Sequence, residues 1–338
     1  MSLEVKKSIC RWCNSKCFVK VYLSDGKLEK IEEDKHHPQA EDLRTIVRSC
    51  SRAQAAKEWF YHPARLNYPL KRAGETGENK WGQISWEQAL TEIAEKLSEI
   101  KQKYGAEAVA TSKGTGRTHD EFRRRFFNLF GSPNTISPDQ ICFGPAAITS
   151  LAMFGYTLSS ANLSAPTANV SCLLIAGHNP EQAFRHTWYP ILRQLKRGMK
   201  LIVIDPRRTA AAQRADIWLQ LRPGTDYALY LAMINVIIAQ KLYDKEFVER
   251  WCSGFDKLVK CTSRYTPERV AAITWVPAEM IKEAARIYAT NKPAIQVVSM
   301  GLEQSPNSIQ TLVARFALTA ITGNIDIQGG ERLGMRNS

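Results

Sequence analysis

Four cysteines near the N-terminus have the residue type and spacing to hold a metal centre. Cys10, Cys13 and Cys17 crowd into one short stretch, and Cys50 returns much later. Four thiolates around one small volume form a soft metal site. The layout favours a cubane iron–sulfur cluster, which takes one cysteine per iron. A four-cysteine zinc site and a site without metal stay open, although the paired Cys-x-x-Cys knuckles of a zinc ribbon are missing.

A fifth cysteine, Cys142, lies among turn-forming residues just before a helix that Pro145 is expected to open. A cysteine at a helix N-terminus has a favoured thiolate. Cys142 is therefore predicted with equal weight to be a metal ligand or nucleophile, or to be a small buried apolar residue. The other three cysteines lack this context, and we expect them to be core or surface residues: Cys172, Cys252 and Cys261.

Further candidate residues follow a series of apolar runs at 172–176, 201–204, 217–221 and 295–298. Continuous apolar runs are typical of buried parallel strands, and their alternation with helical segments predicts an α/β fold with a doubly wound, mostly parallel sheet. Ligands of such sheets bind outside the carboxyl ends of the strands. The residues expected there are Gly177, Asn179, Asp205, Arg207, Arg208, Thr209, Gly224, Asp226 and Gly301.

The chemistry of these strand-end residues suits a nucleotide-like ligand. Glycines allow a close backbone approach, while arginines and backbone N–H groups bind phosphate. A carboxylate accepts hydrogen bonds from a ribose diol or from the guanine N1–H and amino group. The chain has neither a Gly-x-Gly-x-x-Gly nor a Walker A motif, which disfavours ordinary NAD or ATP binding. Solvated loops of a purely structural α/β domain are the alternative.

The segments around the cysteine cluster predict a small β-rich unit. Alternating residues on both sides of Asp25-Gly26 predict a β-hairpin over 18–23 and 28–31, which would hold the first three cysteines opposite the loop that delivers Cys50. A helix over 51–60 begins directly after Cys50. Arg52 projects from its first turn, either as a surface residue or as a cation between the cluster and a second redox centre.

The segment between this unit and the predicted sheet is expected to be scaffold. Ser85 and Gln88 predict a capping box for a helix that Gly105 ends, and a second helix spans 119–130. One apolar stripe runs along the first helix: Trp86, Leu90, Ile93, Leu97, Ile100 and Tyr104.

The composition and net charge limit the classes of protein to which the chain can belong. The 338 residues are 44% hydrophobic and 23% charged, which suits a soluble globular protein of two or more domains. The formal net charge of +13 is spread along the chain, so we expect a solvated or subunit-facing surface and no nucleic-acid partner. No apolar run has transmembrane length and no signal region opens the chain, which predicts a cytoplasmic protein without direct membrane insertion. Eight cysteines then point to metal or reactive thiols before disulfides.

With a cysteine cluster, a loop cysteine and a nucleotide-type α/β region in this order, the chain resembles the molybdopterin oxidoreductases of the dimethyl-sulfoxide-reductase superfamily. Within it, the likeness is greatest to the tungsten-dependent acetylene hydratases. The resemblance runs through nearly the whole chain. The segments that carry it, besides the cysteine spacing, are 131–134, 205–209, 222–226, 242–249 and 322–325.

The resemblance implies the cofactors and their residues. Cys10, Cys13, Cys17 and Cys50 would hold a [4Fe–4S] cluster, and Cys142 would be a ligand of molybdenum or tungsten carried by two pterin guanine dinucleotides. Arg52 matches the residue between cluster and pterin, and the strand-end residues would hold one dinucleotide. It also implies an iron–sulfur domain over 1–62, part of an α/β middle domain over 63–140, a Rossmann-like dinucleotide-binding domain over 141–328 and a tail over 329–338.

The expected function is that of the N-terminal part of a molybdenum or tungsten oxidoreductase of anaerobic metabolism. Its cluster would pass electrons between the metal–pterin site, where a small molecule reacts, and an external electron-transfer protein or iron–sulfur subunit. We expect the chain to be incomplete and inactive alone, with a possible C-terminal companion chain. One alternative is a non-redox tungsten hydratase, which Asn14 opposes because the hydratases have a catalytic aspartate there. The other is a non-catalytic iron–sulfur or zinc binding fragment.

Overall fold

The computed structural model of the chain describes residues 3–13, 17–34, 50–114, 119–159 and 169–334. The chain divides into two compact units. Unit 1 comprises Met1–Gln54 together with Ile141–Ser338, and unit 2 comprises Ala55–Gln140.

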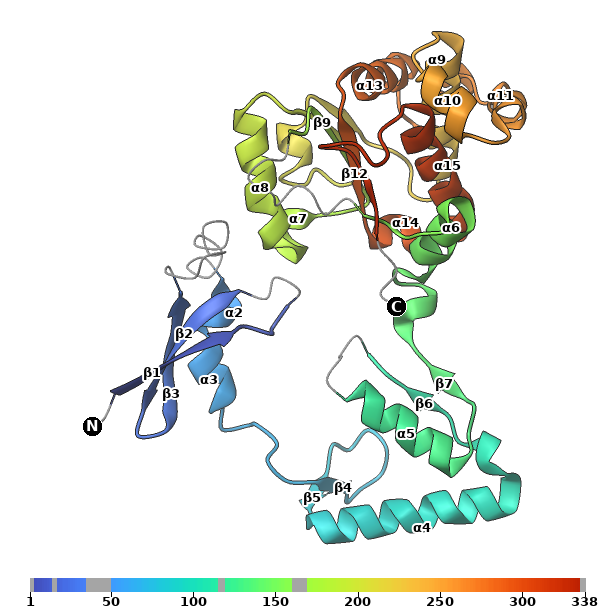
Figure 1. The fold of residues 1–338 in the computed structure, drawn as a ribbon. Coiled ribbons are helices and arrows are strands. Elements are labelled where there is room, and N and C mark those ends of the chain that lie inside the picture. The colour runs from blue at the N-terminus through green and yellow to red at the C-terminus, as the bar shows by residue number, and fades with distance from the viewer. Residues whose placement is uncertain (1–2, 14–16, 35–49, 115–118, 160–168, 335–338) are drawn as a thin grey trace. The chain divides into compact units, whose positions relative to one another are not determined.

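The N-terminal part of unit 1 is a three-stranded antiparallel sheet in the order β1-β2-β3. Its strands are β1 (Leu3–Ile9), β2 (Phe18–Ser24) and β3 (Lys27–Glu33), with the short helix α2 (Ser51–Gln54) beside them (Figure 1). The predicted hairpin is β2–β3, and its turn residues Asp25 and Gly26 both have positive φ, as a two-residue hairpin loop requires. The sequence analysis did not predict β1, whose seven residues are all exposed.

Unit 2 consists of short strands and two longer helices. Its elements are α3 (Ala56–Phe60), β4 (Leu70–Arg72), β5 (Trp81–Gln83), α4 (Trp86–Tyr104), η1 (Ala106–Ala108), β6 (Thr111–Ser112), α5 (Asp120–Phe130), β7 (Thr135–Ile136) and η2 (Pro138–Gln140). Strands β4 and β5 pair antiparallel, while β6 and β7 pair parallel and are joined through α5. The helix expected over 51–60 is in fact two short helices, α2 and α3, interrupted at Ala55.

Helix α4 begins and ends where predicted, but only half of its capping box forms. Ser85 Oγ accepts a hydrogen bond from the backbone N–H of Gln88 at 3.0 Å. The other half of the box would need the Gln88 Oε1 to accept from the backbone N–H of Ser85, and this bond does not form. The Gln88 side chain instead donates from its Nε2 to Glu92 Oε1 at 2.9 Å.

The rest of unit 1 is an α/β region. Its elements are α6 (Gly144–Phe154), β8 (Leu158–Ser159), β9 (Cys172–Ala176), α7 (Pro180–Ala183), α8 (Arg185–Lys196), β10 (Lys200–Ile204), η4 (Ala212–Arg214), β11 (Ile217–Leu219), α9 (Asp226–Ala239), α10 (Lys245–Trp251), α11 (Phe255–Thr262), α12 (Pro267–Thr274), α13 (Ala278–Thr290), β12 (Ala294–Val298), α14 (Met300–Glu303), α15 (Ser308–Ile321) and β13 (Arg332–Leu333).

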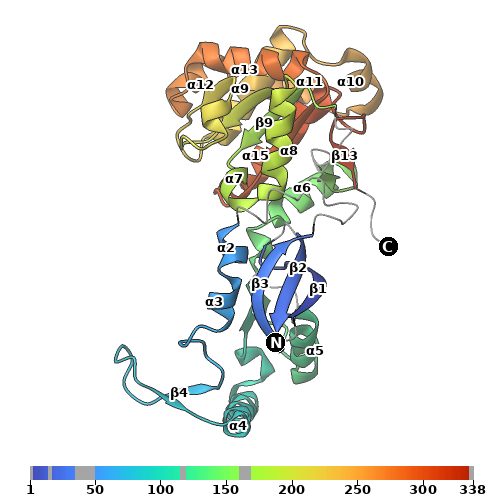
Figure 2. The same ribbon diagram turned by 90° about the vertical axis from the view of Figure 1, so that its left-hand side faces the viewer.

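The four strands that the apolar runs predicted form one parallel sheet in the order β11-β10-β9-β12. Alternate residues of β9 enter two different cores: Leu174 joins the core beneath α9, α13 and α15, and Leu173 joins the core beneath α8. Figures 1 and 2 show these helices on opposite faces of the sheet. Burial on both faces explains why the strands are almost entirely apolar, as in a parallel sheet covered by helices. The exceptions are Lys200, exposed at the start of β10, and Gln296 of β12, which is buried and hydrogen-bonded.

A buried polar network fastens the segment after α15 to the sheet. Arg315 Nη2 and Glu331 Oε1 form an ion pair at 2.7 Å, and Glu331 is completely buried. The same Glu331 oxygen accepts from the backbone N–H of Gln296 in β12 at 3.0 Å. Asn324 Oδ1 accepts from the backbone N–H of Ala294 at 2.9 Å.

In the described part of the chain, no helix combines the length and apolar character that crossing a membrane requires.

Candidate metal and nucleotide site

The cysteine cluster is built on the connection between β1 and β2. Ile9 and Phe18 are paired across these strands, and the backbone N–H of Cys10 donates to the carbonyl of Cys17 at 2.8 Å, which closes the loop. Cys50 lies directly before α2. The loop between β1 and β2 and the start of α2 therefore carry the four cysteines that the sequence predicts to be cluster ligands.

The surroundings of Cys17 favour its neutral thiol. Its pKa is raised to about 12, mainly by burial and also by charge repulsion from Cys10, Cys13 and Cys50. Burial likewise raises the pKa of Cys10, again with repulsion from Cys13 and Cys50. Among the described residues, however, no group of three or more His, Cys, Asp or Glu side chains converges tightly enough for a single metal ion.

Arg52 is an exposed residue in the first turn of α2. Its positive charge opposes the increase in the pKa of Cys10. A cation next to four thiolates offsets part of their mutual repulsion. Asn14, which bears on the hydratase alternative, lies outside the described residues.

Cys142 lies in a tight turn directly before α6. Phe143, the N-cap residue, has φ 67°, a left-handed conformation that is uncommon for a bulky residue. Gly144 and Pro145 then open the helix, as the proline predicted. The Cys142 thiol is half-buried. The other three cysteines are where we expected them: Cys172 is fully buried in β9, Cys252 is half-buried at the end of α10 and Cys261 is exposed on α11.

The strand order places the switch point of the sheet between β9 and β12. From β9 the chain moves outward to β10 and β11, and then returns to the other edge of β9 as β12. Gly177 after β9 and Gly301 after β12 cross closely here, and the Gly301 N–H donates to the Gly177 carbonyl at 3.2 Å. A Cβ on Gly177 would lie 2.8 Å from the Gly301 Cα, so neither position tolerates a side chain. Such a crevice is where open α/β sheets bind ligands.

Two buried carboxylates lie at neighbouring strand ends. Asp205, which follows β10, accepts a hydrogen bond from the backbone N–H of Arg207 at 2.8 Å. Burial raises the pKa of Asp226, at the start of α9, to about 6, and the charge of Asp205 adds to the increase. A buried carboxylate with a raised pKa is typical of a binding site. A guanine edge or a ribose diol offers hydrogen-bond donors to such a group.

The remaining strand-end residues differ in their exposure and in their contacts. Arg207 is mostly exposed and Arg208 is exposed, so both are available to an anion. Thr209 is buried and its Oγ1 accepts from the backbone N–H of Ala212 at 3.2 Å, which supports the loop itself. Gly224 has φ 83° in the turn before α9, a conformation that favours glycine. Asn179 Oδ1 is buried without a hydrogen-bond partner among the described residues, as a ligand-binding group would be.

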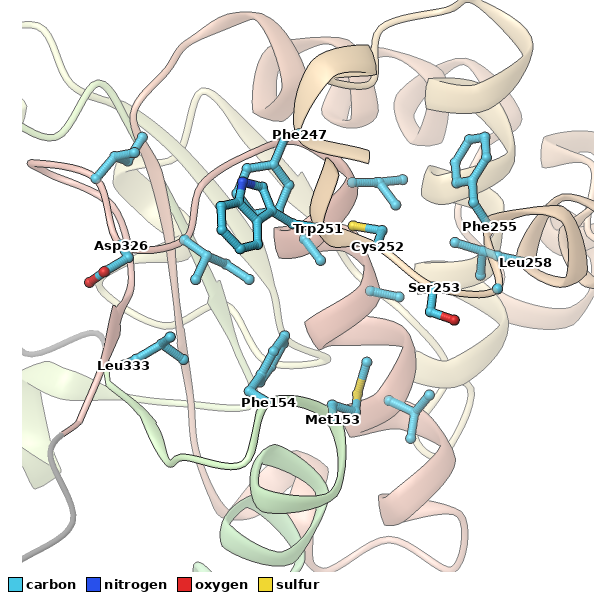
Figure 3. Close-up of a pocket in the computed structure, with 17 residues that line it drawn as sticks. Met153, Phe154, Phe247, Trp251, Cys252, Ser253, Phe255, Leu258, Asp326 and Leu333 are labelled. Carbon is cyan, nitrogen blue, oxygen red and sulfur yellow. The ribbon is translucent and has the colours of Figure 1, made fainter. Parts of the chain in front are cut away.

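A separate apolar cavity of about 810 Å³ lies between α6, α10, α11 and α15. Figure 3 shows Phe154, Phe247, Trp251 and Phe255 around it. Its lining contains none of the residues that the sequence predicted for the site.

The sequence analysis missed Glu303, a buried carboxyl at the end of α14. Burial raises its pKa, and the backbone N–H groups of Phe143 and Ala146 partly oppose this increase. The only sequence signal was an acidic residue two positions after the strand-end Gly301.

Two family models match successive parts of the chain. Residues 3–62 match the molybdopterin oxidoreductase Fe4S4 domain, and residues 65–337 match the molybdopterin oxidoreductase family. The chain belongs to the molybdopterin oxidoreductase family.

Individual relatives cover nearly the whole chain but only part of their own length. The chain is 40% identical to acetylene hydratase of Syntrophotalea acetylenica over 342 residues, which is 98% of this chain and 45% of the relative. It is 33% identical to the molybdopterin-containing subunit of thiosulfate reductase from Salmonella typhimurium, over 96% of this chain and 41% of that subunit. The solved structure of acetylene hydratase from Pelobacter acetylenicus superposes with a TM-score of 0.80 at 38% identity, and covers 97% of this chain and 45% of that one. The chain thus spans less than half the length of these relatives.

Family membership decides between the metals that the spacing left open. The Fe4S4 match selects a [4Fe–4S] cluster over zinc, and the family cofactor is molybdenum or tungsten held by bis-pterin guanine dinucleotide. The residues present fit both groups. The four cysteines are of the residue type that ligates such a cluster. The glycine crossing allows a close backbone approach, and the buried Asn179 Oδ1 is an acceptor without a partner among the described residues.

Proposed function

We propose that this chain is the cluster- and pterin-binding part of a molybdenum or tungsten oxidoreductase. The cluster's electrons would pass to an external carrier protein. The observation that carries the proposal is the match of residues 3–62, which include Cys10, Cys13, Cys17 and Cys50, to the molybdopterin oxidoreductase Fe4S4 domain. A cytoplasmic location and a small-molecule substrate belong to the same proposal.

Each group of residues has a distinct task in this proposal. Cys10, Cys13, Cys17 and Cys50 hold the cluster, and Arg52 keeps a positive charge at its edge. Cys142 is the protein ligand of the metal. When bound, the metal–pterin centre supplies two-electron chemistry at the substrate and the cluster supplies one-electron transfer.

The strand-end residues position the dinucleotide. Asp226 and Asp205 accept from the guanine or ribose donors, and Arg207 and Arg208 neutralise phosphate. Gly177 and Gly301 let the backbone approach the ligand. Residues 1–62, 63–140 and 141–328 are proposed as the iron–sulfur domain, part of a middle domain and the dinucleotide domain.

The test is metal and nucleotide analysis of chain purified without oxygen. We expect about four Fe per chain, and guanine nucleotide released together with Mo or W. Cys50→Ser should lose Fe. Cys142→Ser should keep Fe and lose Mo or W, while Cys261→Ser, at an exposed cysteine, should lose neither. One Zn per chain without guanine would contradict the proposal.

The second candidate is a hydratase in which tungsten acts as a Lewis acid. The 40% identity to acetylene hydratase favours it. Asn14 opposes it, because an amide cannot act as a protonated carboxylic acid. Hydration of acetylene by tungsten-loaded chain, increased by Asn14→Asp, would select the hydratase. Reduction of the cluster by substrate or carrier would select the oxidoreductase.

A further inference from the structure

Two side chains of the edge strand β11 hold the loop that follows β10, residues 205–209. The backbone pairing of β10 with β11 ends with the last residues of both strands. Just beyond it, the indole Nε1–H of Trp218 donates to the carbonyl of Asp205 at 2.8 Å. The Nε2–H of Gln220 donates to the carbonyl of Pro206 at 3.1 Å. Side-chain donors of β11 thus satisfy backbone acceptors where the loop leaves the sheet.

The two donors lie on one face of β11, because they are two residues apart in a strand. Leu219, which lies between them, joins the core beneath α9, α13 and α15. The Trp218 ring packs against the other core, beneath α8. Packing therefore fixes the position of the indole N–H, whereas the Gln220 side chain is exposed. Trp218 is the more rigid of the two supports.

The 205–209 loop is also fixed from within. Asp205 Oδ1 accepts from the backbone N–H of Arg207 at 2.8 Å, and the N–H of Thr209 donates to the Arg207 carbonyl at 2.9 Å. The Arg207 side chain is nevertheless 70% exposed, and Arg208 is exposed as well. Two solvent-accessible guanidinium groups on a restrained backbone form a pre-organised site for an anion, because little backbone freedom is lost on binding.

We infer that Trp218 and Gln220 are positioning residues of the nucleotide site, which hold the 205–209 loop so that Arg207 and Arg208 present their guanidinium groups to phosphate. The inference rests on the proposed function, since it takes both arginines as the residues that bind the phosphates of the dinucleotide. Trp218 and Gln220 act through the backbone of the loop and not through contact with the ligand.

Backbone hydrogen exchange tests the support without a ligand. Trp218→Phe keeps an aromatic ring in the core and removes the N–H donor. The amides of Arg207 and Thr209 should then exchange about 2- to 10-fold faster, the effect of losing one net hydrogen bond. Gln220→Met removes the second donor and should have a smaller effect, because that side chain is exposed. Unchanged exchange in Trp218→Phe would overturn the inference.

Calorimetric titration with GDP and with guanosine connects the loop to phosphate. On chain produced without the pterin cofactor, Trp218→Phe should weaken GDP binding by about 3- to 10-fold and affect guanosine binding less, because only GDP carries phosphate. In an Arg207→Gln/Arg208→Gln background, Trp218→Phe should cause no further loss of GDP affinity. A merely structural role would weaken both ligands equally, with or without the arginines, and would contradict the inference.

Trp188→Phe is the matched control. Trp188 belongs to the same core as Trp218 and is 5% exposed, but it lies on α8 and not on the strand beside the loop. The same exchange of an indole for a phenyl ring should lower stability there and leave the ratio of GDP to guanosine affinity unchanged. An equal change of this ratio in Trp188→Phe and Trp218→Phe would overturn the inference.

Inorganic pyrophosphate separates failure of the inference from failure of the proposed function. If wild-type chain binds pyrophosphate but neither GDP nor guanosine, the proposed dinucleotide site fails, and the effect of Trp218→Phe on pyrophosphate binding still decides the inference. If GDP binding depends on Arg207 and Arg208 but not on Trp218, the proposed function stands and the inference is wrong. Binding of none of the three ligands would contradict both.

Discussion

Strand β9 of unit 1 is buried at all five of its residues, whereas α4 of unit 2 has no buried residue in nineteen. Both segments carry strong apolar patterns in the sequence. In the described part of unit 2 only Ala56 and Ser132 are buried, while large side chains such as Phe122 and Leu129 are 75% exposed. Periodicity thus reveals which face of an element is apolar, but burial depends on whether another element covers that face.

The difference separates two sources of stability. The parallel sheet is stabilised by side chains that pack on both of its faces. Helices α4 and α5 have no buried residue, so they depend on caps and on side-chain pairs within the helix.

The largest change in stability is expected from the loss of the buried ion pair in unit 1. Arg315→Met leaves Glu331 completely buried without its cation, which should lower the free energy of unfolding of unit 1 by about 3–5 kcal/mol. Lys200→Met breaks the partly exposed pair with Asp216 and should cost about 0–1 kcal/mol. Urea denaturation followed by circular dichroism measures both values. Equal losses would show that burial of the Arg315 pair does not matter.

Two leucine-to-alanine substitutions compare β9 of unit 1 directly with α4 of unit 2. Leu174→Ala removes a side chain with 0% exposure from β9 and should cost about 2–5 kcal/mol. Leu90→Ala on α4, where the leucine is 61% exposed, should change stability by about 0.5 kcal/mol or less. A large loss from Leu90→Ala in the isolated chain would mean that the apolar face of α4 is covered in solution.

The sequence predicted the parallel strands well because burial on both faces leaves an uninterrupted apolar run, as in 172–176. It predicted the cysteine cluster because metal ligation restricts residue type and spacing. It missed β1, whose exposed Leu3 and Val5 give only a weak alternation, since hydrogen bonding to β2 and not burial keeps that strand in place. It missed Glu303 because the burial of an acid is set by tertiary contact and leaves no local pattern.

Asp226 is an exception within the packed region, because its burial opposes folding. The pKa is about 6 in the folded chain and 3.8 in the reference state, so the folded chain binds the proton more tightly. Stability should therefore fall as pH rises from about 4 to 6 and stay lower above that range. Asp226→Asn removes this penalty and should stabilise unit 1 by about 2–3 kcal/mol at pH 7.5, with little effect below pH 4.

Asp216 provides a control with the opposite sign. Burial raises its pKa, but the Lys200 and Leu201 hydrogen bonds outweigh burial, and the net pKa is lowered. Asp216→Asn should therefore destabilise the chain at pH 7.5 and lose that effect in acid. Urea titrations at several pH values test both variants. A destabilising Asp226→Asn at neutral pH would mean that its carboxylate has a cationic partner in solution.

The smallest expected effect concerns a local interaction in unit 2. Ser85 Oγ caps α4, so Ser85→Ala should destabilise that helix by about 1 kcal/mol. Because α4 has no buried residue, the loss should appear as faster amide exchange in residues 86–90 and leave the urea midpoint of the sheet unchanged. Gln88→Ala serves as the control, since its side chain bonds to Glu92 and not to the cap. If Ser85→Ala also shifted the unfolding of the sheet, the two units would unfold as one, and the separation drawn between the packed region and unit 2 would not hold in solution.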